Sequence, residues 1–224
     1  MPFSLRLMHA ELPGHLEDRT ASLDRLHTLL LHVRGIQTAL TEDAQLAGRI
    51  GDGPAAVALW RAREAAVLTQ IVNQLYFLKD YAACLMVMEA LVGANPDVLV
   101  YQSQLGRLYL QLGNTQAAAY AFQRYDKRIA MFKAQQQATA AATTVTVLPI
   151  DESRANIDKG FLHMATGNYN EAVLKFEEAH ALAPIDVEAT NNLAVAHLYL
   201  GRLRQAIAVL EEAVRQVSYN LQFI

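Results

Sequence analysis

The sequence predicts an all-α protein in which repeated pairs of helices stack into a right-handed superhelical solenoid. Apolar residues recur at three- and four-residue intervals through most of the 224 residues, which is the spacing of one face of a helix. Only 11 glycines and 6 prolines are present, too few turn residues for a many-stranded sheet. A helix-pair pattern also repeats in the second half of the chain, which indicates a stack of similar units.

Composition limits the class of protein. Hydrophobic residues make up 53% and charged residues 18%, so most of the chain can bury a core and is not disordered. The net charge of −3 gives no basic footprint for nucleic acid. A single cysteine, Cys84, excludes an internal disulfide framework and suits a reducing compartment. No apolar stretch is long enough to span a membrane and no secretion signal is apparent, so a soluble intracellular protein is expected.

Glycines set the phase of the repeat. Gly167 and Gly201 lie 34 residues apart, the period of the tetratricopeptide repeat. A small residue lies five positions after each turn residue, and an aromatic residue or Leu lies four positions after that small residue. The members of this pattern are Gly113, Ala118 and Phe122, then Gly167, Ala172 and Phe176, then Gly201, Ala206 and Leu210, with Lys79, Cys84 and Met88 at the same offsets in an earlier unit.

The small residues let two antiparallel helices approach closely, and the larger residue fills the gap between repeats. Pro96 and Pro184 end the second helix of their units because proline cannot donate to the helix ladder. Units one and two therefore occupy residues 65–132. Units three and four occupy residues 153–224, where residues 219–224 are expected to form the first turn of a capping helix.

The remaining segments are helical but depart from the repeat. Residues 1–64 are predicted to form an N-terminal cap, a degenerate repeat-like pair with helices near 4–12 and 17–46. A long helix over 54–78 would begin at Pro54. Residues 133–152 are an insert whose first half should extend the preceding helix, since Ala and Gln favour helices. Its Thr/Val part (143–147) is expected to be extended loop, and Pro149 to break the helix.

Several segments resemble a known family: Leu5-Arg6-Leu7-Met8, Leu59-Trp60-Arg61-Ala62-Arg63, Leu78-Lys79-Asp80-Tyr81 and Asn191-Asn192-Leu193-Ala194-Val195. Together they are similar to the subunit 12 family of the TRAPP (trafficking protein particle) complex, in its C-terminal tetratricopeptide region. The resemblance extends into the off-consensus N-terminal third. Two features depart from it: the longer, Ala/Thr-rich insert, and the family's continuation past the end of this chain.

The resemblance implies a non-enzymatic accessory subunit of the TRAPP III tethering and exchange complex, acting in ER-to-Golgi traffic and autophagy. The implied partners are the other large subunits, subunit 11 foremost. The implied location is cytoplasmic and peripheral to ER–Golgi membranes, with membrane contact only through the complex. No nucleic acid and no small-molecule substrate are expected.

No catalytic, cofactor-binding or metal-binding residues are predicted. The histidines lack metal-ligand spacing, and His163 and His197 share one repeat position, where packing between helices is expected. Cys84 occupies a small-residue position of the core, so a buried, inert thiol is expected. No phosphate loop, nucleophile elbow or HExxH motif occurs.

A clamp for a terminal carboxylate would need Lys, Arg and Asn on the first helices. Asn192 fits that pattern, but Ile157 and Phe161 stand where basic and amide residues would be needed, so this function is rejected.

The first helices are instead expected to line a protein-binding groove, polar in units one and two and apolar in units three and four. The candidate groove residues are Thr69, Asn73, Ser103, Arg107, Ile157, Phe161, Met164, Asn191, Asn192, Val195 and Leu198. An open apolar groove usually marks an interaction site. Two kinds of occupant remain open: an amphipathic helix of a partner, or the chain's own insert or a further C-terminal helix.

Two functions of different classes follow. The first is a scaffold subunit of a multisubunit tethering complex, with a large apolar interface. The alternative is a stand-alone adaptor that binds a short peptide motif in the concave groove.

Overall fold

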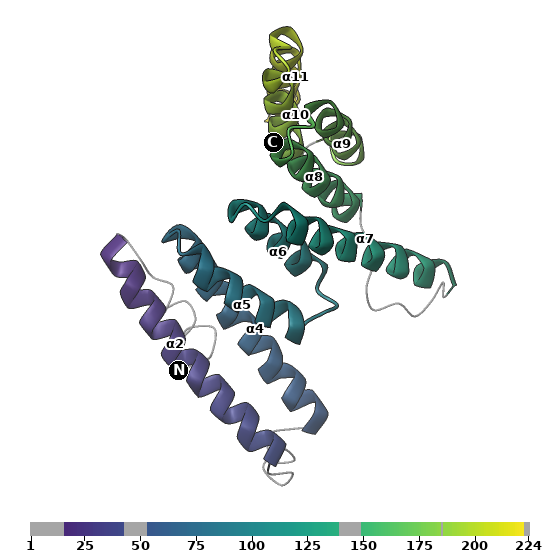
Figure 1. Ribbon diagram of the computed structural model, residues 1–224. Helices are drawn as coiled ribbons and strands as arrows, with labels where there is room; N and C mark the ends of the chain where they lie inside the picture. Colours follow the sequence, from purple (N-terminus) through teal and green to yellow (C-terminus); the bar gives the residue numbers. More distant parts are fainter. Residues whose placement is uncertain (1–15, 43–52, 139–148, 185, 222–224) are drawn as a thin grey trace. The chain divides into compact units, whose positions relative to one another are not determined.

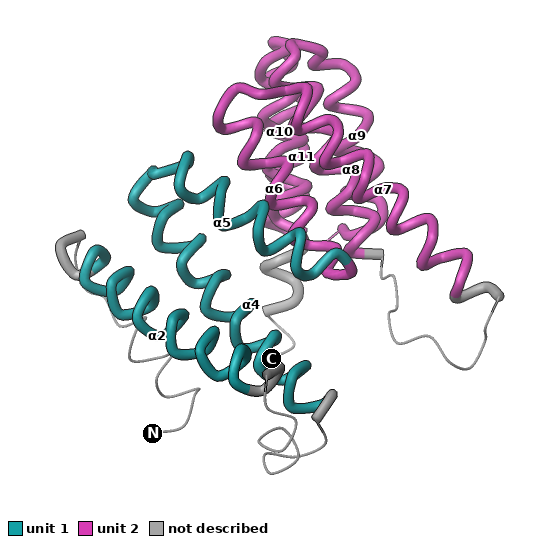
Figure 2. Tube along the Cα trace, turned by 60° about the horizontal axis from the view of Figure 1, so that its bottom comes forward, with its two compact units in different colours: residues 1–96 teal, residues 97–224 magenta. Residues whose placement is uncertain are grey.

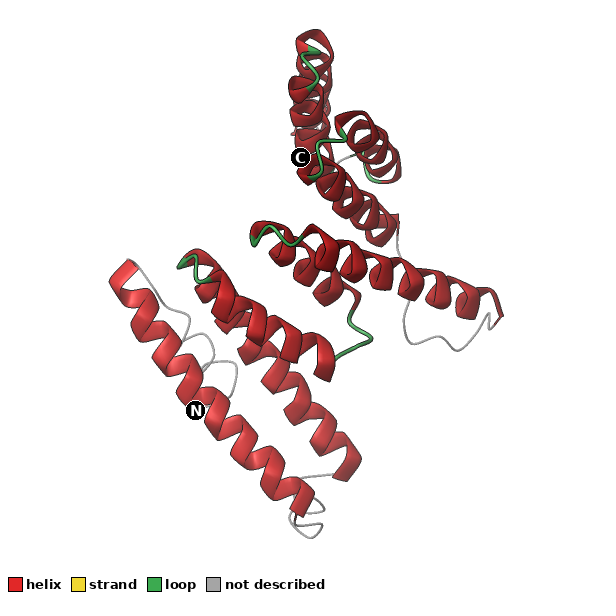
Figure 3. Cartoon of the chain, in the orientation of Figure 1, coloured by secondary structure: helices red, strands yellow, loops and turns green. Residues whose placement is uncertain are grey.

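The computed structural model describes residues 16–42, 53–138, 149–184 and 186–221. Every regular element within these ranges is an α-helix (Figure 3). In chain order (Figure 1) the helices are α2 (Leu16–Glu42), α4 (Gly53–Phe77), α5 (Tyr81–Ala94), α6 (Leu99–Gln111), α7 (Thr115–Ala138), α8 (Pro149–Ala165), α9 (Tyr169–Leu182), α10 (Val187–Tyr199) and α11 (Leu203–Leu221).

The chain forms two compact units, residues 1–96 and residues 97–224 (Figure 2). In the first unit α4 packs against both α2 and α5. Leu26 and Val33 of α2 are completely buried, as is Val67 of α4. An ion pair of 2.7 Å between Arg34 Nε and Glu64 Oε1 also joins α2 to α4.

Two predicted helices of the N-terminal third are present, since α2 and α4 match the expected helices near 17–46 and 54–78. The predicted helix near 4–12 lies outside the described residues. The expected boundary between residues 64 and 65 falls inside α4, so cap and first repeat share a helix and form one unit. The division after residue 96 separates repeats one and two, which were expected to share a domain.

The described residues of the second unit form three helix pairs, α6/α7, α8/α9 and α10/α11, and the members of each pair pack together. The turn glycines Gly113, Gly167 and Gly201 have φ angles of +74°, +76° and +69°. The residue after each glycine donates its N–H to the carbonyl five positions earlier, at 2.8–2.9 Å, which is the Schellman ending of a helix. The predicted repeat phase is therefore confirmed in this unit.

Close helix approach also follows the predicted pattern. A Cβ added at Gly106 would lie 2.2 Å from the ring of Phe122, and one added at Gly160 would lie 2.3 Å from the ring of Phe176. Each glycine is 16 residues before its aromatic partner, on the first helix of the same pair. Only glycine leaves room for the ring at this distance.

Two expected helix boundaries are wrong. α8 begins at Pro149, one turn before the expected start at Ser153, because proline is well accommodated at the first position and Asp151 and Glu152 favour the N-terminal end of the helix dipole. Residues 219–221 continue α11 and do not start a capping helix, since no turn residue interrupts that helix. α7 does extend into the insert, to Ala138, while residues 143–147 lie outside the described part.

Candidate functional site

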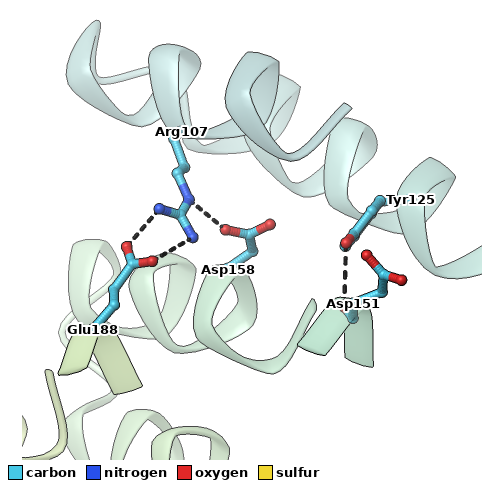
Figure 4. A network of polar contacts seen from close by, with 5 residues as sticks. All are labelled: Arg107, Tyr125, Asp151, Asp158 and Glu188. Carbon is cyan, nitrogen blue, oxygen red and sulfur yellow. Dashed lines mark hydrogen bonds and ion pairs between the residues drawn. The ribbon is translucent and has the colours of Figure 1, made fainter. Parts of the chain in front are cut away.

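A charged network joins the first helices of three successive repeats in the second unit (Figure 4). Arg107 lies on α6, Asp158 on α8 and Glu188 on α10. Arg107 Nε donates to Asp158 Oδ1 at 2.6 Å. Its Nη1 and Nη2 atoms donate to the two carboxylate oxygens of Glu188 at 2.5 and 3.4 Å. All three guanidinium nitrogens are therefore engaged within the chain.

Burial and ion pairing act against each other in this network. The side chain of Asp158 is 0% exposed, whereas those of Arg107 and Glu188 are 29% and 40% exposed. Burial raises the pKa of Asp158, and the neighbouring Arg107 opposes that rise. Burial lowers the pKa of Arg107, but Asp158 and Glu188 together raise it above its ordinary value. One cation thus faces two carboxyl groups, and Arg107 is not available to hold a partner's carboxylate.

A hydrogen bond next to this network ties α7 to the start of α8. The completely buried Tyr125 donates its hydroxyl to the backbone carbonyl of Asp151 at 3.1 Å (Figure 4). Burial is the main cause of a raised pKa at Tyr125, so this hydroxyl stays protonated and acts as a fixed donor.

Phe161 connects the charged network to the hydrophobic core. The Arg107 guanidinium lies 5.2 Å from the centre of the Phe161 ring, a cation–π distance. Phe161 also packs edge-to-face on Phe176, with ring centres 5.8 Å apart. Phe161 and Met164 are half-buried and pack against the core of repeats three and four. The structure therefore brings together two predicted groove residues, Arg107 and Phe161, but it gives both a structural role.

Two predicted groove residues do not reach the surface. Ile157 is completely buried within the core that α8 shares with α9 and α10, and Ser103 is buried on α6. The expectation that they line an open groove is wrong, because α8 packs against α6, α7, α9 and α10 and both side chains are buried.

The exposed residues of the predicted set lie on α10. Asn191, Val195 and Leu198 are all exposed, and their spacing of four and three residues places them on one face of the helix. Asn192 is half-buried. We call Asn191, Val195 and Leu198 the α10 surface. The two predicted polar residues of the first unit, Thr69 and Asn73, lie on α4.

The structure also contains a groove that was not predicted from the sequence. A groove of about 510 Å³ lies between α9 and α11 and is lined by Asn170, Val173, Leu174, Glu177, His197, Arg202, Gln205, Ala208 and Val209. His197 is buried, its Nδ1 has no hydrogen-bond partner, and burial is the main cause of its lowered pKa. The expectation of a packing role for His197 is consistent with this burial.

The thiol of Cys84 is buried, as predicted, and approaches the Val72 carbonyl oxygen at 3.7 Å. Burial, helped by Asp80, raises its pKa to about 11, so little reactive thiolate forms near neutral pH. Within the described ranges no three His, Cys, Asp or Glu side chains are arranged to hold a metal ion. None of the helices in those ranges is long and apolar enough to cross a membrane.

The comparisons with known proteins agree with the repeat geometry. The tetratricopeptide-repeat family model matches residues 163–217. Subunit 12 of the trafficking protein particle complex from Mus musculus is 32% identical over 225 residues, covering 96% of this chain and 26% of the relative. The Homo sapiens subunit 12 is 30% identical over 222 residues, covering 96% of this chain and 28% of the relative.

The chain is homologous to subunit 12 of the trafficking protein particle complex. It spans about a quarter of the length of these two relatives. A tetratricopeptide-repeat protein of Thermus thermophilus superposes with a TM-score of 0.52 at 16% identity, covering 99% of this chain and 94% of that one. This likeness concerns the fold alone, which is the tetratricopeptide-repeat fold.

Proposed function

We propose that the chain is a non-catalytic protein-interaction scaffold, an accessory subunit of the TRAPP III tethering and exchange complex in ER-to-Golgi traffic and autophagy. One observation carries the proposal: the alignment with subunit 12 covers 96% of the chain, so it includes helices α2 and α4, which precede the matched repeat. A match to repeat positions alone would not extend over α2, which precedes the first repeat. The proposed location is the cytoplasm, at the surface of ER–Golgi membranes, with other large TRAPP subunits as partners, subunit 11 foremost.

The α10 surface is the proposed docking face. Val195 and Leu198 present apolar side chains, with exposed fractions of 40% and 50%, and burial of such side chains favours association. Arg107 is already held by two carboxylates, which argues against a clamp for an acidic peptide terminus. A partner helix with an apolar face suits this surface.

The test compares two leucines of equal exposure on different helices. Leu198 on α10 and Leu174 on α9 are each 50% exposed, so Leu198→Asp and Leu174→Asp make the same chemical change at similar cost to folding. The tagged variants are expressed in cells of the source organism, and the co-purified TRAPP subunits are quantified. Leu198→Asp should reduce their recovery by about tenfold or more, because it places a charge in an apolar interface, while Leu174→Asp should retain them.

Thermal unfolding of both variants provides the control for folding. Equal recovery with the two variants would exclude the α10 surface as the docking face. A Phe161 variant is less suitable because Phe161 packs against Phe176 in the core, so its effects on folding and docking would be mixed.

A further inference from the structure

Helix α11 has an exposed row of apolar side chains. Leu203, Ile207, Leu210 and Val214 are 59%, 46%, 41% and 66% exposed. Their spacing of four, three and four residues is that of the a and d positions of a heptad, with Ile and Val at a and Leu at d. This pattern is typical of the seam between two paired helices.

In the preceding repeat, the residue equivalent to Leu210 is covered by a neighbouring helix. Phe176 on α9 occupies the repeat position of Leu210, 34 residues earlier, and is only 1% exposed. It belongs to a core that includes Leu193 and Ala196 of α10, the helix that packs on α9. Leu210 has no equivalent cover among the described residues, which leaves it 41% exposed.

Charged side chains beside the row indicate which kind of helix would cover it. Arg204 and Glu211 are exposed and seven residues apart, so they flank the same edge of the row. The opposite edge carries Ala206, which is buried in the pairing of α11 with α10. The free edge of the row therefore carries one positive and one negative side chain, one heptad apart.

This arrangement is self-complementary in one orientation. When two copies of α11 pair antiparallel, Ile207 of each copy faces the partner's Leu210, and Leu203 faces the partner's Val214. The same register places Arg204 of each copy beside the partner's Glu211, twice by symmetry. In a parallel pair Arg204 would instead face the alanine edge, with no opposite charge.

We propose that α11 is a self-association surface, through which two copies of this chain pair antiparallel along Leu203, Ile207, Leu210 and Val214, with reciprocal Arg204–Glu211 ion pairs. A single pair of helices buries an area at the small end of specific interfaces, so the dimer is weak and concentration-dependent. This inference does not depend on the proposed function.

Charge reversal tests the pairing without changing the core. Arg204→Glu places two pairs of like charges in the homodimer, and so does Glu211→Arg. For each variant alone, the dissociation constant of the dimer should be roughly tenfold or more above that of the unsubstituted chain. Sedimentation velocity over a concentration series measures it. An equimolar mixture of the two variants should recover dimerisation, because both pairs in the mixed dimer are again opposite in charge.

Arg215→Glu is the matched control, since it reverses a charge on the same helix away from the row and should leave dissociation unchanged. Circular dichroism confirms that each variant is folded. A chain that stays monomeric at every concentration would overturn the proposal, and would point to a partner protein or a further segment as the cover of α11. A dimer that tolerates both reversals would also overturn it, because another surface would then be responsible.

Discussion

At the scale of single residues, the turn between the helices of a repeat is the position most strongly constrained by the backbone. Three repeats place glycine there, with φ near +70°. The first repeat places Lys79 at the same offset, with φ of 60°. This left-handed conformation costs a residue with a Cβ about 1–2 kcal/mol. The backbone of Lys79 is therefore strained, at a position that the repeat pattern identifies as the turn.

Lys79→Gly should therefore stabilise the first unit. The gain in free energy of unfolding is expected to be roughly 0.5–1 kcal/mol, since relief of the strain exceeds the extra entropy of glycine in the unfolded chain. Urea unfolding followed by circular dichroism measures it. Lys79→Ala is the control, because alanine keeps the Cβ and should give no gain. Equal stability of the two variants would show that the backbone at this turn is not strained.

Single residues also show where sequence reasoning stops. The 34-residue period located the turn glycines and the buried Phe122 and Phe176, because each of these depends on position within one helix pair. It did not predict that Ile157 is buried while its neighbour Asp158 pairs with Arg107. That outcome depends on how many helices surround α8, which is a property of the packed unit.

At the scale of elements, Arg107 links α6 to α8 and α10. Arg107→Met would leave Asp158 buried without its cation, and breaking such a pair costs roughly 3 kcal/mol. Burial already raises the pKa of Asp158 against the opposing effect of Arg107, so the variant's folded-state pKa should lie still higher. A carboxyl whose pKa is higher in the folded than in the unfolded state costs stability as pH rises above about 4.

The Arg107→Met variant should thus lose much less stability at about pH 5 than at about pH 8, as measured by urea unfolding at both pH values. The double variant Arg107→Met with Asp158→Asn lacks the titrating carboxyl and should lose this pH dependence. A loss of stability that is the same at both pH values in the single variant would contradict the assigned role of Asp158.

Helix boundaries were predictable where local signals were strong. The start of α10 follows Asp186, whose carboxylate accepts the N–H of Glu188 at 2.9 Å. α6 begins at Leu99, one 34-residue period after the predicted start of unit one at residue 65. The start of α8 was misplaced because Pro149 was interpreted as a helix breaker, whereas it occupies the first position of the helix. Proline favours both contexts, and only the packing of α8 against α7 and α9 decides between them.

At the scale of the whole molecule, two surfaces are available for association. The α10 surface is the proposed docking face for a TRAPP subunit, and the α11 row is the proposed self-association face. Both lie on helices of the last repeat and contain exposed apolar side chains. Their separate variants, Leu198→Asp and Arg204→Glu, allow loss of partner binding to be distinguished from loss of dimerisation.

We propose above that this chain acts as a scaffold within a TRAPP complex. Affinity purification of the tagged chain from the cytosol of its own organism, with quantitative mass spectrometry of the co-eluting proteins, tests it most directly. A scaffold subunit should co-elute with other TRAPP subunits, subunit 11 among them, in near-equal amounts. Recovery of no TRAPP subunit, with a set of unrelated proteins that share a short sequence motif, would contradict a scaffold role and favour a peptide-binding adaptor.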